Sequence, residues 1–282
     1  MDFGAAQSAI TNLQSVFLNR VLFFMQPIST PAIILHSFKY SESSKIVRLL
    51  TRELGVISAV AKGATRPKSK FGARLQLLSE GVAELYVKPN RDLHTLAEFE
   101  VENLRQELAT DIRRYASASA LAELALRFAP SEPNEEIYVR LVAYFESLAV
   151  VPESYLETTS LAALWGIVCA LGFEPALDGC ARDGREIPEG PALFSIADGG
   201  LLCATCKKES GTGATTTRLQ SDDRVALEQL LLGRVDEVGP LPSRHAAAHR
   251  RLLVRFITRH VSEDRDLKAL SFWDQLSWDA TL

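Results

Sequence analysis

The feature that most constrains the fold is a change in hydrophobic rhythm near residue 103. From about 32 to 101 the chain consists of short segments rich in β-branched and aromatic residues, separated by turn signals such as PNRD at 89–92. These segments are AIILHSFKY, KIVRLLTREL, GVISAVAKG, LQLLSEGVAELYVK and LHTLAEFEV, and Gly55 supplies a turn between the second and the third. Such a series of five strands predicts a small antiparallel barrel, of which the five-stranded OB-fold is the commonest form.

Beyond this point apolar residues recur at helical spacing. Pro130 and Pro152 end the first two helical stretches, and Asn134 is a predicted cap for the second. The segment at 158–172 is strongly apolar, which predicts the core helix of this part. The stretches with helical spacing are 103–129, 134–150, 158–172, 221–233 and 243–261. The chain is therefore predicted to have an α+β fold, with an OB-fold barrel followed by an all-helical C-terminal domain.

We expect three parts in the chain. Their predicted bounds are 1–24 for an N-terminal extension, 25–104 for the OB-fold domain and 105–282 for the helical domain, with a cysteine-containing module at 175–217. In the extension, apolar residues keep a helical spacing at Ile10, Leu13, Phe17, Val21 and Phe24. Two interpretations of the extension remain open: an amphipathic helix docked on the body, or translated sequence upstream of a start at Met25.

Positive charge is concentrated in the barrel segment, although the whole chain has a net charge of −4. Residues 31–90 hold ten cations and four acids, a net charge of +6, which leaves −10 for the remainder. Between strands, the sequence AKGATRPKSKFGARLQ at 61–76 carries five cations and no acid: Lys62, Arg66, Lys68, Lys70 and Arg74. Glycines and a proline predict a loop. The charge predicts a polyanion partner for this domain alone, and a solvated face of mixed charge is the alternative.

OB-folds bind single-stranded nucleic acid on one face of the sheet and its flanking loops, combining phosphate contacts with base stacking. The five loop cations are therefore our first candidates for phosphate contact. Further candidates for DNA binding are Lys39, Arg48 and Arg52. Phe38 and Tyr40 are candidate stacking platforms for bases, although aromatic residues in a strand also serve as core residues.

The cysteine spacing suggests a metal site of the zinc-ribbon kind. Cys203 and Cys206 form a C-x-x-C pair, and Cys180 and Asp183 upstream have the same spacing. Two such knuckles joined by a hairpin, here ALFSIADGGLLC, supply four ligands for a tetrahedral zinc. A glycine-rich subdomain that folds without metal is the alternative. Cys169, inside the apolar segment at 158–172, is predicted to be a buried, inert thiol.

The sequence contains no recognisable catalytic motif. Phosphate-binding loops, dinucleotide fingerprints, nucleophile elbows and zinc-protease motifs are absent from the sequence, which argues against an enzyme.

His245 and His249 have a metal-capable spacing, but neighbouring arginines favour a basic helix face that binds a polyanion or is simply solvated. This second positive strip would comprise Arg244, Arg250, Arg251, Arg255 and Arg259. No apolar run reaches the roughly 18–20 residues of a membrane helix, and four cysteines are too few for a disulfide framework. We therefore expect a soluble protein of the reducing cytoplasm.

The order of these segments resembles the RecO family of bacterial recombination mediators. The likeness runs from about Ser29 to Leu276 and rests on HSFKYSESSKIVRLLT, ELGVISAVAKGATRPKSK, WGIVCALGFEPALDGCARDG, FSIADGGLLCATC and the final LKALSFWDQL. The sequence departs from the family pattern at two places. Asp183 stands where zinc-bearing members have a second cysteine, and residues 1–24 precede the usual start.

The resemblance implies a non-enzymatic role in DNA repair and homologous recombination. RecO-like proteins combine an OB-fold with a helical domain that often carries a zinc module. They bind single- and double-stranded DNA, anneal complementary strands and, with RecR, help to load RecA onto strands coated by single-strand-binding protein (SSB), in the RecF pathway. The implied cofactor is at most one structural zinc, and the implied location is the bacterial cytoplasm, at the nucleoid. An OB-fold RNA-binding protein, a protein adaptor and an enzyme without recognisable motifs are the alternatives.

Overall fold

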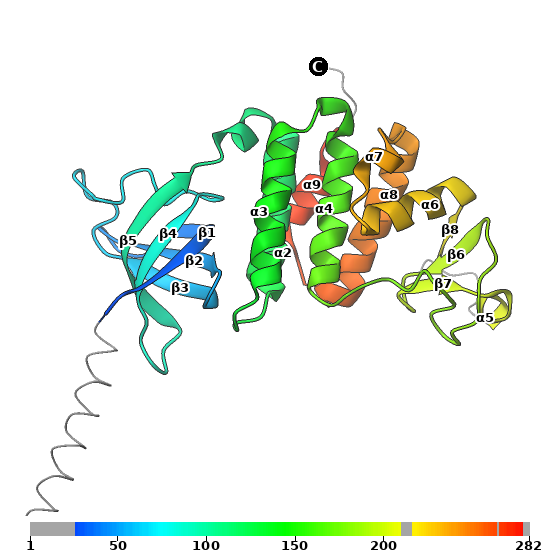
Figure 1. Cartoon of the computed structure of the whole chain (residues 1–282), viewed down its shortest axis with the longest axis horizontal. Helices are drawn as coiled ribbons and strands as arrows, with labels where there is room; N and C mark the ends of the chain where they lie inside the picture. Colours follow the sequence, from blue (N-terminus) through cyan, green and yellow to red (C-terminus); the bar gives the residue numbers. More distant parts are fainter. Residues whose placement is uncertain (1–25, 210–215, 264, 279–282) are drawn as a thin grey trace, which may run out of the picture. The chain divides into compact units, whose positions relative to one another are not determined.

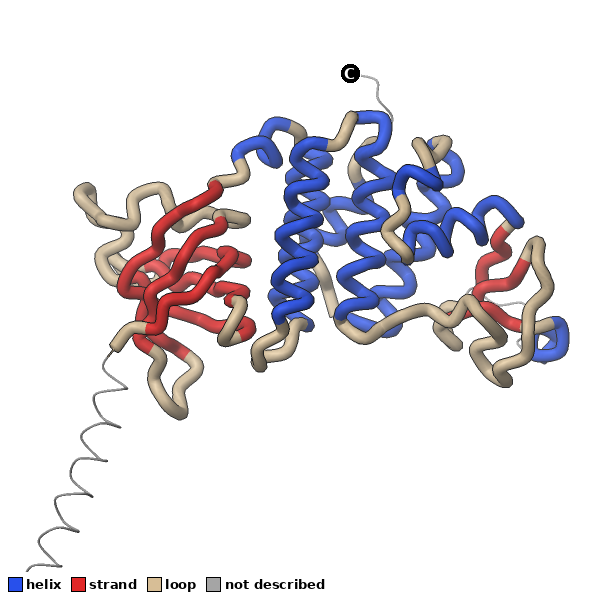
Figure 2. The backbone as a smooth tube through the Cα atoms, in the orientation of Figure 1, coloured by secondary structure: helices blue, strands red, loops and turns tan. Residues whose placement is uncertain are grey.

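The computed structural model describes residues 26–209, 216–263 and 265–278, which fall into two compact units (Figure 1). The first unit ends at Leu104 and also includes Pro130–Asn134, and the second comprises Arg105–Ala129 and the chain from Glu135 onward. The first is built from strands and the second mainly from helices (Figure 2). The predicted α+β class is thus confirmed. The predicted extension lies outside the described residues.

The first unit is a closed five-stranded barrel. Its strands are β1 (Ile28–Lys39), β2 (Lys45–Thr51), β3 (Gly55–Ala61), β4 (Glu80–Tyr86) and β5 (Leu93–Asn103). They follow one another around the barrel in the order β1-β2-β3-β5-β4, and β4 pairs with β1 to close it. All these pairs are antiparallel except β3 with β5. This arrangement confirms the predicted OB-fold barrel.

A bulge in β1 determines which side chains of this strand face solvent. The register with β2 shifts between Ile34 and His36. Ile33 and Ile34, before the bulge, are both fully buried, whereas His36 and Phe38 after it are exposed. A bulge re-aims the side chains that follow it. Aromatic side chains that could have packed in the core are consequently presented on the barrel surface.

The second unit is organised around one apolar helix. Its helices are η1 (Gln106–Thr110), α2 (Ile112–Phe128), α3 (Glu135–Val150), η2 (Glu153–Tyr155), α4 (Leu156–Ala170), α6 (Ser221–Leu231), α7 (Val235–Val238), α8 (Ser243–Phe256), η3 (Ile257–Val261) and α9 (Lys268–Gln275). Every residue of α4 from Thr158 to Val168 is buried, and α4 contacts α2, α3, α6 and α8. The prediction that this segment is the core helix is therefore confirmed. No helix in the described part of the chain is long and apolar enough to cross a membrane.

The first helical stretch begins later than its apolar spacing predicts. Asp111 has an extended backbone, and its carboxylate accepts hydrogen bonds from the backbone N–H groups of Arg113 and Arg114 at 2.7 and 3.4 Å. This cap satisfies amide groups that a helix start leaves unpaired. The segment before it forms the short 3-10 helix η1 instead, so two elements replace the single helix predicted from residue 103.

The cysteine module is a small sheet with one short helix. β6 (Ala192–Ser195) pairs with β7 (Gly200–Leu202) as the predicted hairpin, and β8 (Thr216–Leu219) lies on the other side of β6. Cys203 follows β7, and α5 (Ala204–Glu209) then carries Cys206, so the second knuckle lies at the junction of the two elements. The hairpin predicted from ALFSIADGGLLC is confirmed.

A buried histidine makes the stability of the helical unit sensitive to pH. His249 on α8 is 1% exposed, and the carboxylate of Asp223 on α6 lies 3.7 Å from its Nε2. Burial lowers the pKa of His249 below its usual 6.5. Because the unfolded chain then binds more protons than the folded chain, the free energy of unfolding falls as pH drops through about 6.5. Melting curves at pH 7.5 and 5.5 should show this loss, and His249→Gln should reduce it; an equal loss in the variant would contradict the assignment.

Candidate nucleic-acid interface and metal site

The basic loop between β3 and β4 is a folded structure. It contributes Ala64, Phe71 and Leu75 to the hydrophobic core of the barrel, and Phe71 is only 1% exposed. The loop ends at Leu78, whose backbone N–H donates to the carbonyl of Ile34 at 2.8 Å. Apolar anchors at intervals of three to seven residues thus hold the loop to the barrel. Anchors of this kind fix where the intervening polar residues point.

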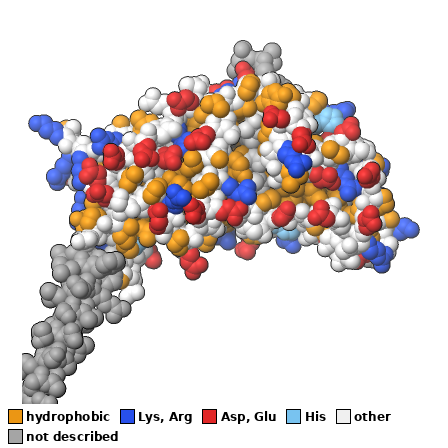
Figure 3. Space-filling view, in the orientation of Figure 1, with side chains coloured by type: hydrophobic (Ala, Val, Ile, Leu, Met, Phe, Trp, Pro, Cys, Tyr) orange, Lys and Arg blue, Asp and Glu red, His pale blue; other side chains and the backbone are white. Residues whose placement is uncertain are grey.

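The predicted phosphate-binding side chains all point outward from this loop. Each of the five is exposed: Lys62, Arg66, Lys68, Lys70 and Arg74. Within the described residues none of them forms an ion pair. The Nζ atom of Lys70 lies 5.6 Å from the centre of the Phe71 ring. Blue side chains gather at the edge of the barrel in Figure 3. The loop therefore offers positive charge that acids of the same chain do not neutralise.

Hydrogen bonds join the basic loop to the turn between β1 and β2. The backbone N–H of Thr65 donates to the carbonyl of Ser43 at 3.2 Å, and its hydroxyl donates to the carbonyl of Glu42 at 2.6 Å. Lys39 and Lys45, at the two ends of this turn, are directly opposite each other. Like charges in that position destabilise a strand pair, so both lysines favour an anionic partner. The sequence alone did not single out Lys45, because the pairing depends on strand register.

Aromatic side chains lie beside this charge on the outer face of β1 and at Tyr40, directly after its last residue. Phe38 is 41% exposed and Tyr40 is 59% exposed. The rings of His36 and Phe38 are 5.4 Å apart. His36, Phe38 and Tyr40 occupy alternate positions, which project from the same side of an extended chain. The sequence prediction included Phe38 and Tyr40 but missed His36, which the two-residue period could have revealed.

The remaining predicted DNA-binding residues differ in position. Arg48 is half-buried and pairs in register with His36, so it belongs to the same outer face. Arg52 follows the other end of β2, about 20 Å along the strand from Lys45. The structure thus brings together the loop cations, Lys39, Arg48 and the aromatic residues, and leaves Arg52 at the far end of the barrel.

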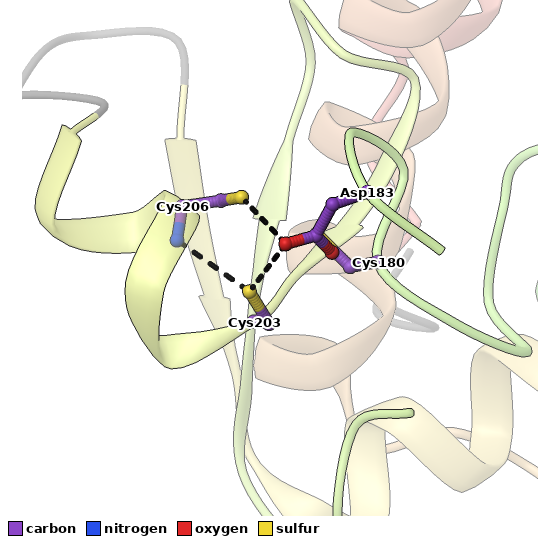
Figure 4. A group of neighbouring side chains, drawn as sticks. All are labelled: Cys180, Asp183, Cys203 and Cys206. Carbon is purple, nitrogen blue, oxygen red and sulfur yellow. Dashed lines mark hydrogen bonds between the residues drawn. The ribbon is translucent and has the colours of Figure 1, made fainter. Parts of the chain in front are cut away.

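The predicted metal ligands meet in one cluster. The thiols of Cys180, Cys203 and Cys206 and a carboxylate oxygen of Asp183 all lie within 4.8 Å of one another (Figure 4). The three thiols are buried. The thiols of Cys203 and Cys206 donate to Oδ2 of Asp183 at 3.5 and 3.3 Å. Cys169 lies outside this cluster and is half-buried, so the prediction of a buried thiol is wrong in that respect, although desolvation raises its pKa to about 11.

The donor set fits a tetrahedral zinc. Zinc bonds of about 2.3 Å to sulfur and about 2.0 Å to oxygen place neighbouring ligand atoms roughly 3.5 Å apart in a tetrahedron, close to the observed sulfur–oxygen distances. Three thiols and one carboxylate also suit the preference of zinc for sulfur, nitrogen and oxygen donors. The cluster could therefore hold a metal ion without a large rearrangement.

Protons in the cluster make metal binding dependent on pH. Hydrogen bonds from the thiols, that of Cys180 first, lower the pKa of Asp183 to about 2. Burial, followed by the hydrogen bond to Asp183, raises the pKa of Cys206 to about 12. At neutral pH the carboxylate is ionised and the Cys206 thiol is protonated. Metal binding must displace that proton, so metal affinity should rise with pH.

Two family profiles match the chain. The profile described as "Recombination protein O N terminal" covers residues 25–105, and the one described as "Recombination protein O C terminal" covers residues 109–270. The chain belongs to the RecO family.

Curated relatives extend this RecO assignment over most of the chain. Each of the following is named DNA repair protein RecO. The protein from Anaeromyxobacter sp. (strain K) is 32% identical over 263 residues, 89% of this chain and 98% of the relative. That from Symbiobacterium thermophilum is 32% identical over 248 residues, 86% of this chain and 95% of the relative. That from Rubrobacter xylanophilus is 29% identical over 234 residues, 81% and 88% of the two chains. These names support a role in DNA repair, and the descriptions of the two profiles support a role in recombination.

The two RecO profiles separate the two candidate sites. The basic loop and the aromatic face lie within the N-terminal profile, and the cysteine cluster lies within the C-terminal one.

The second positive strip, predicted on the last long helix, is interrupted. Arg250 forms an ion pair with Glu157, and His245 bonds to Asp223 through Nδ1 at 2.6 Å. The predicted strip is therefore wrong at Arg250, because neighbouring helices supply acids that the local sequence does not reveal.

Proposed function

We propose that this chain is a DNA-binding mediator of recombinational repair whose barrel captures single strands through their phosphates. The observation that carries the proposal is the set of five exposed loop cations, unpaired within the described residues and held beside exposed aromatic rings. Phosphate contacts release condensed counterions and supply sequence-independent affinity. Aromatic rings add base stacking, which is equally tolerant of sequence.

A single DNA strand bound to this surface would contact both the cations and the aromatic rings. Its phosphates would follow the basic loop and Lys39, and its bases would stack on Phe38 and Tyr40, with Arg48 beside His36 on the same face. Double-stranded DNA would use the phosphate contacts alone. Annealing follows if the protein holds two complementary strands and screens their mutual repulsion. No step breaks a covalent bond, so we assign no catalytic residue.

The partners we propose are those of a recombination mediator. RecR and SSB would bind the protein directly, and RecA would be loaded onto the strand that SSB leaves, which places the protein at the bacterial nucleoid. The charge of the chain supports separate surfaces for DNA and for proteins. Outside residues 31–90 the net charge is −10, which disfavours wrapping by DNA and leaves that surface for protein partners.

We further propose that the cysteine cluster holds one structural zinc. Cys180, Asp183, Cys203 and Cys206 would be its ligands, and the ion would cross-link the two knuckles of the module. The fit of the ligand atoms to a tetrahedron supports this assignment. Metal analysis of the purified protein is the direct measurement.

Base stacking gives the experiment that tests the proposed function. Replacing Phe38 and Tyr40 together with alanine should weaken binding to a single-stranded oligonucleotide by roughly tenfold or more, because each stacked base contributes about 1–3 kcal/mol. Strand annealing should slow in parallel, whereas affinity for a duplex, whose bases are already stacked, should change little. Phe272→Ala, at an exposed aromatic of α9, is the matched control. Equal loss for duplex and single strand would contradict stacking on this face.

Two other functions give different results in the same assays. An RNA-binding protein would prefer an RNA oligonucleotide over DNA of the same sequence. An adaptor that works through its helical unit would keep its protein partners after deletion of residues 25–105. The unpaired charge beside the aromatic face would serve RNA as well as DNA, so we favour DNA because the curated relatives are named DNA repair proteins.

A further inference from the structure

An arginine links the two knuckles of the cysteine cluster. The Nε atom of Arg185 lies 3.4 Å from Oδ2 of Asp183, in the first knuckle. Its Nη1 donates to the hydroxyl of Thr205 at 3.2 Å, and Thr205 stands between the two cysteines of the second knuckle. The side chain of Arg185 is 64% exposed, so the guanidinium lies on the solvent side of the cluster. The four ligand types alone did not point to this residue.

The oxygen that Arg185 approaches is the one a metal would need. Oδ2 of Asp183 faces the thiols of Cys203 and Cys206, and it is also the oxygen nearest to the guanidinium. The other oxygen, Oδ1, accepts from the backbone N–H of Arg185 at 3.2 Å and so stays oriented whatever the side chain does. A divalent ion bound to Oδ2 would lie within a few ångströms of a positive charge. Repulsion between the two cations opposes binding.

Contacts that involve no metal ligand atom also hold the module together. The backbone N–H of Ala181 donates to the carbonyl of Leu201, and that of Leu201 to the carbonyl of Ala176, at 2.8 and 2.9 Å. Arg182 makes a two-pronged ion pair with Asp198, at 2.7 and 3.0 Å. Small metal domains that lack such contacts fold only when the metal binds. In this module a metal would connect the knuckle at 180–183 to the knuckle at 203–206. The same segments are already connected by the sheet, by the ion pair of Arg182 with Asp198, and by the hydrogen bond of Arg185 to Thr205.

We propose that Arg185 competes with the metal for Asp183, closing the module when the ion is absent and making the site an exchangeable one. The proposal rests on the zinc site proposed above and adds what sets its affinity. Asp183 is the exposed ligand of the set, since its side chain is 27% exposed while the three cysteines are buried. Exchange between guanidinium and metal therefore happens at the solvent side, and the buried thiols keep their positions.

Replacing Arg185 with glutamine tests the competition. Zinc affinity, measured against a chromogenic chelator, should rise by about tenfold, the size expected when a unit positive charge a few ångströms from a divalent ion in a water-like dielectric is removed. The chelator-treated variant should melt below the chelator-treated wild type, because the link between the knuckles is lost. The rise in melting temperature on adding zinc should be larger in the variant. A role that is merely structural would lower stability without tightening zinc binding.

Arg182→Gln is the matched control, because it removes the same charge from the same module but breaks the pair with Asp198. It should lower stability with and without zinc and leave zinc affinity unchanged. Weaker or unchanged zinc binding by Arg185→Gln refutes the competition, even if the protein binds zinc. If no zinc binds to the wild type or to Arg185→Gln, the metal site itself is refuted and the competition falls with it.

Discussion

Charge reversal at Lys68 and Lys70, to glutamate, is expected to weaken binding to single-stranded DNA by more than about tenfold while the barrel stays folded. Both side chains are exposed and neither forms an ion pair within the described residues, so their loss removes only the 5.6 Å contact between Lys70 and the Phe71 ring. The salt dependence should also change. At about −0.7 per phosphate contact, five contacts give a log–log slope of roughly −3.5, and three give roughly −2.1.

The measurement is an oligonucleotide titration at several salt concentrations. A matched control reverses Lys207 and Lys208, two neighbouring exposed lysines of the cysteine module, which changes the net charge by the same amount. The control should retain the slope of the wild type. If the Lys68 and Lys70 variant binds as tightly as the wild type and with the same slope, the loop has no part in DNA binding.

Much of the barrel could be predicted from the sequence because its signals are local. Two-residue alternation, turn residues and Gly55, the first residue of β3, lie within a few positions of one another. The hairpin turn at Gly55 also places Arg52 at the end of β2 that is remote from the loop following β3, but Arg52 was grouped with the loop cations by its charge alone. The pairing of Lys45 with Lys39 depends on the exact register of the β1–β2 hairpin, which the sequence of the turn did not specify.

In the metal site, too, the local sequence revealed some residues and the structure was needed for others. Repeated spacing brought Cys180, Asp183, Cys203 and Cys206 to notice, because each knuckle is a local turn. The role of Arg185 needed coordinates, since its contact with Thr205 spans 20 positions of sequence. Asp111 likewise makes the first long helix begin later than predicted, through hydrogen bonds that apolar spacing does not detect. Periodicity therefore located the elements, whereas polar contacts set their ends and their chemistry.

A substitution at Phe71 tests whether the folded conformation of the basic loop contributes to DNA affinity in addition to its charge. Phe71→Ala is expected to lower the free energy of unfolding of the barrel by about 3–5 kcal/mol, because it empties a position that is 1% exposed in the core. The same substitution should weaken DNA binding several-fold at unchanged net charge. Without its anchor the loop samples many conformations, and ordering it on DNA consumes binding energy.

The salt slope distinguishes this effect from charge reversal. Phe71→Ala keeps all five cations, so its slope should stay near that of the wild type while affinity falls at every salt concentration. Phe71→Leu, which refills most of the volume, should restore both stability and affinity. Binding must be measured where circular dichroism shows the barrel of Phe71→Ala to be folded. Full affinity in a folded Phe71→Ala would mean that the cations act as a flexible charged segment, and the anchoring of the loop would then serve stability alone.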